Sequence, residues 1–341
     1  MTPALHTRRF GDVEMIIALD STARGPALGG CRWKLYPDLD AARRDALALA
    51  AAMTRKAALA GLALGGGKAV VVGDPRTRSA DQLLAFGDFV ESLGGRYITA
   101  ADMGTGEREM AVIARRTRHV VGLPRELGGC GDPGPFTAQG VELAIAAALR
   151  HVGRELAGAH VAVQGAGSVG RALIAALCRA GARVSAADPA RAALETLPRE
   201  VAVAAPERIE HVRCDVFAPC GPPGVIGAGL AEALDCRIVC GAANNPLESL
   251  AVAQRLEARG VLYVPDFVAN AGGLIHLGVA LGGGDEAATR RHLSVIPENL
   301  ERVLAHAKSR GIDPARAAEE LALAAAGQRG AQSERSRHRA S

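Results

Sequence analysis

The sequence predicts an α/β protein of two domains, and three observations support this fold class. Short apolar runs, typical of buried strands, alternate with longer Ala/Leu-rich segments of helical character. The chain has 341 residues, more than one hydrophobic core usually organises. A Gly/Pro-rich stretch at 128–135, GGCGDPGP, can sustain neither a helix nor a strand, so we expect the domain boundary there.

Local patterns predict the individual elements. The predicted strands are the apolar runs at 14–20, 69–73, 160–165 and 237–242. A helix is expected to begin at Ser79, because Ser79 and Gln82 have the spacing of a capping box, and to end at Gly94-Gly95. Helical patterns also cover 137–153 and 299–326, and such closing helices can pack back on the first domain. Residues 327–341 are expected to form a disordered tail.

Composition and charge exclude several functional classes. Hydrophobic residues make up 49% of the chain and charged residues 22%, as in folded proteins with sizeable cores. The longest Ala/Leu-rich stretch, 47–64, is interrupted by polar residues, and the first ten residues lack a secretory pattern. We therefore expect a cytoplasmic protein without a membrane partner.

Neither metal nor nucleic acid is an expected partner. The seven cysteines form no C-x-x-C pair, so they predict no metal site. The net charge is +4, and residues 327–341 contribute much of it through four arginines against one glutamate. The rest of the chain is nearly neutral, which argues against binding to nucleic acid.

The segment HVAVQGAGSVG at 160–170 predicts a dinucleotide site. Gly165, Gly167 and Gly170 follow a predicted strand and open a predicted helix that includes Ser168 and Val169. In this context the glycines permit a tight turn, and the start of the helix offers backbone N–H groups to a pyrophosphate.

Asp188, 18 residues beyond Gly170, ends the next predicted strand and is suitably placed to bind the adenosine ribose. Its carboxylate would repel a 2′-phosphate, so we expect NAD, although Arg191 nearby keeps NADP as an alternative. The structural alternative for Asp188 is a turn residue before Pro189.

A Gly-Gly-Gly-Lys sequence at 65–68 indicates a ligand site in the first domain. It is not a phosphate-binding loop, because the required earlier glycine is one position early at Gly61 and Ala69 replaces the hydroxyl residue. Three glycines instead indicate backbone close to a ligand, with the Lys68 amine in the same cleft. Lys56 supplies a second amine, so that one lysine can act as a base while the other holds a carboxylate. The alternative is two ordinary surface lysines.

Asp102, in YITAADMGT at 97–105, ends a predicted strand and enters a Gly-rich turn. Functional carboxylates often lie in such turns. On this segment alone, a helix cap or turn residue is the favoured alternative.

Several separate blocks together resemble the glutamate/leucine/phenylalanine/valine dehydrogenase family, from about Phe10 to Ala326. The blocks are GPALGGCRW, AMTRKAALAGLALGGGK, YITAADMGT, FTAQGV, VAVQGAGSVG, CDVFAPC, GAANN and PDFVANAGGLIHL. The likeness is strongest to phenylalanine dehydrogenases, and leucine dehydrogenases are also similar. It implies an N-terminal substrate-binding and oligomerisation domain (1–132), a Rossmann NAD-binding domain (133–298) and a cleft between them.

The resemblance also implies roles for individual residues. Lys56 would bind the substrate α-carboxylate, Lys68 would activate water, and Asp102 would carry protons to and from the amino nitrogen. Further substrate contacts would come from Gly29, Gly30, Met53 and Asn245. Thr137, Asn244 and Asn270 would lie near the nicotinamide.

Substrate choice follows from two leucines. Glutamate-specific relatives have a lysine and a serine where this chain has Leu28 and Leu277. Burying a carboxylate against two leucines would cost several kcal/mol, so glutamate should be rejected and an apolar amino acid preferred. Leu274 is larger than the residue that relatives tend to have there and would reshape the pocket. Core packing is the alternative role for Leu28 and Leu277.

The expected reaction is the reversible, NAD-dependent conversion of an apolar L-amino acid to its 2-oxo acid and ammonia. Two alternatives remain: an enzyme of this fold acting on another amine-bearing metabolite, and a catalytically silent NAD-binding regulator. We expect a homo-oligomer, a dimer or larger. Family members usually carry a further N-terminal segment that contributes to subunit contacts, so the size of the assembly stays open.

Overall fold

The computed structural model describes residues 3–337, and the side chains as far as Gly327. The chain divides into two compact units. The first unit comprises Met1–Pro133, Leu277–Gly284 and Ala322–Ser341, and the second comprises Gly134–His276 and Asp285–Leu321. The main division, after Pro133, lies one residue from the boundary expected at 132/133.

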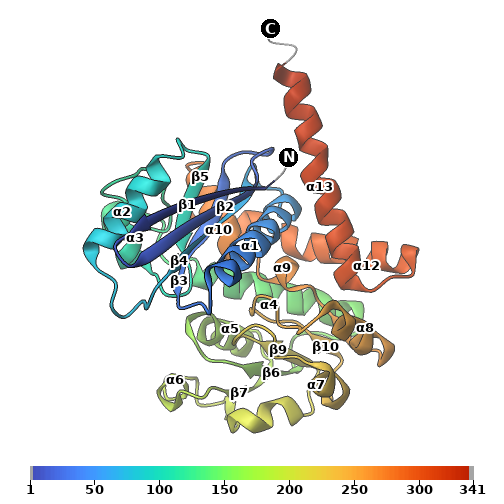
Figure 1. The fold of residues 1–341 in the computed structure, drawn as a ribbon. Coiled ribbons are helices and arrows are strands. Elements are labelled where there is room, and N and C mark those ends of the chain that lie inside the picture. The colour runs from blue at the N-terminus through green and yellow to red at the C-terminus, as the bar shows by residue number, and fades with distance from the viewer. Residues whose placement is uncertain (1–2, 338–341) are drawn as a thin grey trace. The chain divides into compact units, whose positions relative to one another are not determined.

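The first unit is built on a five-stranded mixed sheet (Figure 1). Its strands are β1 (Ala4–Phe10), β2 (Val13–Ser21), β3 (Ala27–Lys34), β4 (Gly65–Val72) and β5 (Tyr97–Ala101), in the order β1-β2-β4-β3-β5. Its main helices are α1 (Leu39–Leu59), α2 (Ala80–Glu91) and α3 (Glu107–Ile113), with a short 3₁₀ turn, η1, at Arg125–Leu127. The strands β3, β4 and β5 run parallel to one another, whereas β1 and β4 are antiparallel to β2.

The alternation of side chains along β2 gives this sheet two apolar faces. Ile16 and Ala18 belong to the core beneath α1, whereas Met15 and Ile17 belong to the core that contains residues of α2 and α3. Successive side chains of a strand point to opposite faces, so one continuous apolar run supplies both cores.

The second unit is built on a six-stranded sheet in which every neighbouring pair is parallel. Its strands are β6 (His160–Gln164), β7 (Arg183–Ala187), β8 (Ala202–Val203), β9 (Val216–Pro219), β10 (Ile238–Val239) and β11 (Leu262–Tyr263), in the order β11-β10-β9-β6-β7-β8. From β8 to β11 this is the 3-2-1-4-5-6 order of a Rossmann fold. The predicted α/β class with a Rossmann domain is therefore confirmed.

Helices precede, connect and follow these strands. They are α4 (Gly134–His151), α5 (Ser168–Arg179), α6 (Arg191–Leu194), the 3₁₀ turn η2 (Pro206–His211), α7 (Ala228–Ala233), α8 (Leu250–Ala258) and α9 (Asp266–Ala269). Four further helices complete the chain: α10 (Gly272–Leu281), α11 (Glu286–His292), α12 (Val295–Arg310) and α13 (Pro314–Arg337). Among the described residues, no helix has the length and apolar character needed to cross a bilayer.

Several local predictions agree with the structure. The capping box forms with both of its hydrogen bonds at the start of α2, and Gly94 and Gly95 adopt positive φ after its end. The strand predicted at 69–73 begins earlier than expected, because Gly65 to Gly67 are part of β4. Each of these three glycines packs against a neighbour that leaves no room for a side chain, so this part of the strand requires glycine.

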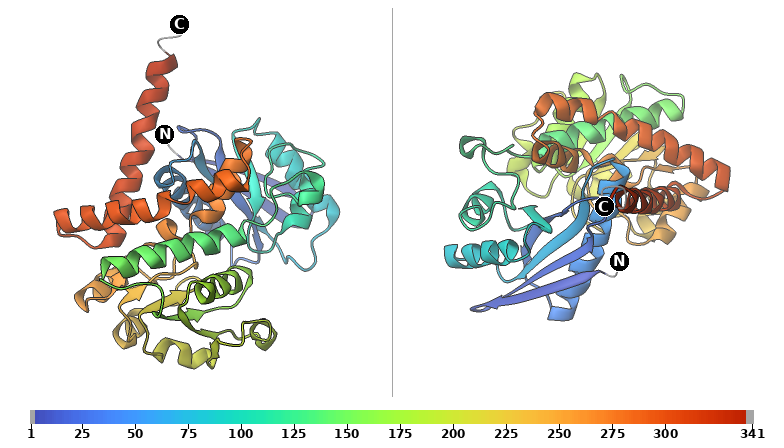
Figure 2. Two further views of the ribbon diagram at one scale, coloured as in Figure 1. Left: turned by 180° about the vertical axis from the view of Figure 1, so that it is seen from behind. Right: turned by 90° about the horizontal axis from the view of Figure 1, so that it is seen from above.

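The closing helices divide between the two units. α12 packs against α4 and α9 within the second unit (Figure 2), and the residues from Ala322 onwards belong to the first unit. α13 continues to Arg337, where we expected a disordered tail from residue 327. Alanine, glutamine, glutamate and arginine have high helix propensity, which explains the continuation. Residues 338–341 of that predicted tail lie outside the described residues.

Candidate active site

Glycines bring the backbones of β3 and β4 unusually close together. A Cβ at position 29 would lie 1.7 Å from the carbonyl oxygen of Gly67. At position 67 it would lie 2.8 Å from the ring of Tyr97, whose hydroxyl donates a 2.6 Å hydrogen bond to the carbonyl of Gly29. Bare backbone on these strands is therefore a steric requirement of the packing.

Gly30 makes room for a carboxylate from the neighbouring strand. A Cβ at this position would lie 2.6 Å from Cβ of Asp102, which directly follows β5. Lys68 on β4 reaches across β3 and forms an ion pair with Asp102. The structure thus brings together the two residues predicted to be the catalytic pair.

This ion pair is largely shielded from solvent. The Lys68 side chain is 8% exposed and that of Asp102 is 21% exposed. Burial raises the pKa of Asp102, but the charges of Lys68 and Arg32 and hydrogen bonds from Lys68 and the Met103 N–H outweigh it, so the pKa lies below its ordinary value. Asp102 is therefore a carboxylate at neutral pH.

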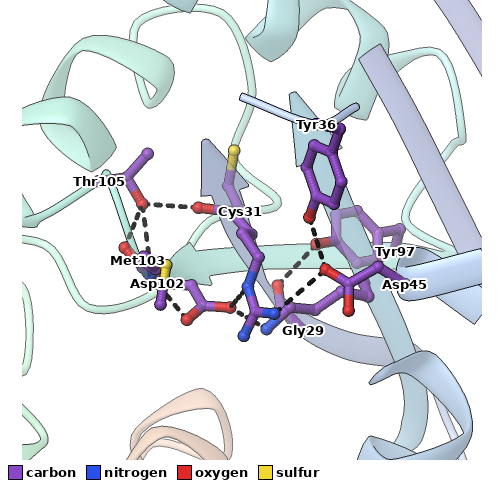
Figure 3. A network of polar contacts seen from close by, with 10 residues as sticks. Gly29, Cys31, Tyr36, Asp45, Tyr97, Asp102, Met103 and Thr105 are labelled. Carbon is purple, nitrogen blue, oxygen red and sulfur yellow. Dashed lines mark hydrogen bonds and ion pairs between the residues drawn. The ribbon is translucent and has the colours of Figure 1, made fainter. Parts of the chain in front are cut away.

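A second shielded group of charges lies beside this pair (Figure 3). Nη1 of Arg32 donates a 3.1 Å hydrogen bond to Oδ2 of Asp45, which also accepts a 2.5 Å hydrogen bond from the Tyr36 hydroxyl. Nε of Arg32 lies 3.6 Å from Oδ2 of Asp102. The backbone N–H of Asp102 donates to Thr105 Oγ1, and this hydroxyl donates in turn to the carbonyl of Cys31.

The helix α1 carries Met53 and Lys56, which were predicted to contact substrate. Both are half-buried, near the C-terminal end of a helix that packs on β4. A Cβ at Gly66 would lie 2.1 Å from the backbone nitrogen of Thr54, so this glycine sets how closely α1 approaches the strand that carries Lys68. The Thr54 hydroxyl also donates a 2.5 Å hydrogen bond to Asp20.

The three leucines predicted to shape the substrate pocket are all buried. Leu28 on β3 is 1% exposed and Leu277 on α10 is 8% exposed, and both belong to the first unit. The methyl group Cδ2 of Leu277 lies near Gly122, 3.6 Å from where its Cβ would be. Leu274, 7% exposed, belongs to the second unit.

The loop after β6 has the geometry that a dinucleotide pyrophosphate requires. Gly165 has φ of +101°, and a Cβ at Gly170 would lie 2.1 Å from the Gly165 carbonyl oxygen. Around Gly167, by contrast, a Cβ would meet no atom within 4 Å. α5 begins at Ser168, followed by Val169, and no side chain caps its first turn. Its backbone N–H groups could therefore bind an anion.

Asp188 joins the end of β7 to this glycine loop. Its Oδ2 accepts a 2.7 Å hydrogen bond from the Ala166 N–H, and its Oδ1 accepts one of 2.8 Å from the Ala190 N–H. The second bond is the turn role considered as an alternative, and the first fixes the carboxylate beside the loop. The two roles are compatible because each carboxylate oxygen can accept a further hydrogen bond.

A third group of predicted residues gathers at the start of α10. The side-chain nitrogen of Asn270 donates hydrogen bonds to the Ala242 carbonyl at 3.1 Å and to Asn244 Oδ1 at 3.0 Å. A Cβ at Gly272 would lie 3.2 Å from Cα of Thr137, so α4 and α10 meet there. Within the described residues, Oδ1 of Asn270 is buried without a hydrogen-bond partner, and a ligand could donate to it.

Asn245, predicted as a substrate contact, is exposed in the second unit. It has φ of +48°, which asparagine tolerates better than most residues, and its N–H donates a 2.8 Å hydrogen bond to Asp266.

Arg32, Asp45, Tyr36 and Thr105 were not predicted as site residues. Arg32 lies two positions after Gly30, and residues two apart in a strand face the same side. That spacing was the available signal for Arg32. Asp45 and Tyr36 lacked one, because only the packing of α1 on the sheet brings them to Arg32.

Comparison with known proteins gives matches along most of the chain. The family model described as "Glu/Leu/Phe/Val dehydrogenase, dimerisation domain" matches residues 7–119, and the model "Glutamate/Leucine/Phenylalanine/Valine dehydrogenase" matches residues 187–328. Valine dehydrogenase of Streptomyces coelicolor is 42% identical over 322 residues, covering 92% of this chain and 88% of the relative.

Two further relatives have other substrates in their names. Leucine dehydrogenase of Geobacillus stearothermophilus is 38% identical over 315 residues, covering 91% of this chain and 86% of the relative. The crystal structure of L-tryptophan dehydrogenase from Nostoc punctiforme superposes with a TM-score of 0.82 at 34% identity, covering 96% of both chains. A particular likeness to phenylalanine dehydrogenases stays a prediction.

Proposed function

Because the chain belongs to the glutamate/leucine/phenylalanine/valine dehydrogenase family of amino acid dehydrogenases, we propose that it oxidatively deaminates an apolar L-amino acid with NAD⁺. The observation that carries this proposal is the shielded Lys68–Asp102 ion pair in a glycine-lined part of the first unit. A silent regulator would have no need for such a pair.

The chain's own residues would divide the proton chemistry among them. Asp102, whose lowered pKa makes it a carboxylate before substrate binds, takes a proton from the substrate ammonium group. Lys56 holds the α-carboxylate by charge. Lys68 acts in its neutral form, after its own proton has passed to solvent. Once the imine has formed, this amine removes a proton from water, whose oxygen attacks the imine carbon and leads to the 2-oxo acid and ammonia.

The second unit would hold the dinucleotide, which when bound accepts the α-hydrogen of the substrate as hydride. The open space around Gly167 and the uncapped start of α5 fit a pyrophosphate, and Asp188 fits the ribose hydroxyls. The same carboxylate disfavours a 2′-phosphate, which supports NAD over NADP. Thr137, Asn244 and Asn270 would orient the nicotinamide.

An apolar side chain is the best match to the first unit. Leu28 and Leu277 are buried and offer no partner to a charged side chain, so bound glutamate would lose the hydration of its second carboxylate without compensation. The named relatives act on valine, leucine and tryptophan, so side-chain size among apolar substrates is the open variable. Leu274 and Asn245 remain proposed substrate contacts. Because the first domain matches a model described as a dimerisation domain, we also propose a homo-oligomer.

The test is NADH formation at 340 nm with NAD⁺ and a panel of L-amino acids that includes Val, Leu, Phe, Trp and Glu. We expect turnover with apolar members and little or none with glutamate. Turnover only with glutamate would refute the pocket argument. A lack of turnover with every member would favour the silent regulator or an unusual substrate.

Lys68→Ala tests the catalytic role. It should abolish turnover and leave NADH binding intact, because Lys68 and the glycine loop belong to different units. The matched control is Lys308→Ala, which removes an exposed lysine on α12 and should retain wild-type rates. Loss of NADH binding together with turnover in Lys68→Ala would indicate a structural role instead.

A further inference from the structure

Arg32 lies between two carboxylates and has a donor that is not fully used. Its Nη1 hydrogen-bonds to Asp45 at 3.1 Å, and its Nε lies 3.6 Å from Oδ2 of Asp102. This Nε is buried and has no hydrogen-bond partner within the described residues. The side chain is 15% exposed, so a small approach of Asp102 would complete a charge-assisted hydrogen bond in a shielded environment.

The tyrosine and aspartate behind Arg32 hold the guanidinium in place. Asp45 Oδ2 accepts both the Arg32 donor and the Tyr36 hydroxyl at 2.5 Å (Figure 3). Arg32 is on β3, Tyr36 just beyond it and Asp45 on α1, so the contact ties the helix to the strand. A guanidinium anchored at one end can be aimed accurately with the other.

Among the groups that face Asp102, Arg32 is the one that always keeps its positive charge. From β4 Asp102 faces Lys68, from β3 it faces Arg32 and Cys31, and from within β5 it faces Tyr97. Burial raises the pKa of the Cys31 thiol and of the Tyr97 hydroxyl, so both stay neutral. Lys68 must become neutral to activate water, whereas an arginine cannot lose its proton in a protein.

We propose that Arg32 is a positioning residue that keeps Asp102 ionised and aligned while Lys68 is neutral, with Asp45 and Tyr36 as its anchor. This inference rests on the proposed function, because it requires Asp102 and Lys68 to exchange protons in the reaction. It assigns Arg32 no contact with substrate. A purely structural ion pair between β3 and α1 is the rival explanation, and it would not need Nε to face Asp102.

The experiment measures the pH dependence of kcat/KM for oxidative deamination in two variants. One variant removes a positive charge and the other removes a negative charge. The positive charge of Arg32 lowers the pKa of Asp102, so removing this cation favours the protonated form of that carboxyl group. Arg32→Gln should therefore move the acid limb to higher pH, by about one unit. Asp45→Asn removes a nearby anion and should move the same limb to lower pH.

Two further variants separate charge from geometry. Arg32→Lys restores the charge but not the two-ended fork, so the limb should return to the wild-type position while kcat stays lower by about tenfold. The matched control is Arg96→Gln, which removes an exposed arginine at the opposite end of β5 and should leave the profile unchanged. NADH binding and thermal unfolding report whether each variant is folded.

The outcomes distinguish the two proposals. If the acid limb of the kcat/KM profile lies at the same pH in Arg32→Gln, Asp45→Asn and the control Arg96→Gln, the inference is wrong and the role of Arg32 is structural. If Arg32→Gln does not fold, the direction of the Asp45→Asn shift decides. If Asp102→Asn turns over at the wild-type rate, both the catalytic role of Asp102 and the inference fail. An inactive Asp102→Asn with an unshifted Arg32→Gln overturns the inference alone.

Discussion

Gly30→Ala should impair catalysis more than it impairs folding. The backbone at Gly30 does not have a positive φ, so alanine can adopt its conformation. The added methyl would lie 2.6 Å from Cβ of Asp102 and 2.8 Å from the Ala101 carbonyl oxygen. To reach the 3.4 Å at which such contacts become ordinary, the Asp102 side chain must move by about 0.8 Å.

That displacement sets the expected size of the effect. A misplacement of this order at a catalytic group costs roughly tenfold to a hundredfold in rate. Overpacking costs about 1–3 kcal/mol in the free energy of unfolding, which a folded domain can tolerate. We therefore expect kcat to fall by about tenfold or more in a protein that still binds NADH.

Initial-rate kinetics with the best apolar substrate, together with thermal unfolding, would measure both effects. The matched control is Gly229→Ala on α7, where a Cβ would meet no atom within 4 Å. This change should be neutral or slightly stabilising, since alanine is the better helix former. A Gly30→Ala enzyme with wild-type kcat would show that the position of Asp102 does not limit the reaction.

Three further changes test other parts of the structure. Asp188→Ser removes the carboxylate that would repel a 2′-phosphate, so the ratio of kcat/KM for NADP⁺ to that for NAD⁺ should rise about tenfold or more; an unchanged ratio would remove Asp188 from coenzyme choice. Leu28 is 1% exposed, so Leu28→Ala should leave a cavity and lower the free energy of unfolding by about 2–4 kcal/mol, which urea unfolding would measure. The cavity should also favour substrates with larger apolar side chains, which a substrate panel would measure. Preserved stability would contradict the core position of Leu28. Asp102 has a lowered pKa when folded, so its stabilising contribution is present above the ordinary value of 3.8 and is lost as pH falls through the lower folded pKa. Asp102→Asn should therefore flatten the loss of stability below about pH 4, and an acid limb as steep as that of the wild type would refute the assignment.

Local signals explain why much of the site was predictable. The capping box at Ser79 forms within one helical turn, and the segment 160–170 around Gly165 combines a strand, a turn and the start of a helix. Lys68 directly follows a run of three glycines within β4, and Asp102 directly follows the strand β5. Each of these features depends on neighbours in the sequence, which a pattern of residue types can represent.

The parts that were missed depend on contacts between distant segments. The glycines of β4 were expected before the strand, but they belong to it because Gly29, Thr54 and Tyr97 pack against them. No local propensity favours three glycines in a strand; the cost is met by packing that only small residues permit.

The amino-acid sequence by itself determined the fold class, the dinucleotide loop and the identity of the ion pair that we propose as catalytic. The tertiary structure alone decided what surrounds that pair: the parallel register of β3 with β5 places Gly30 beneath Asp102, and α1 brings Asp45 to Arg32. The physical reason is that strand register and helix packing set the separation of charges. In a shielded site, that separation controls which groups hold their protons.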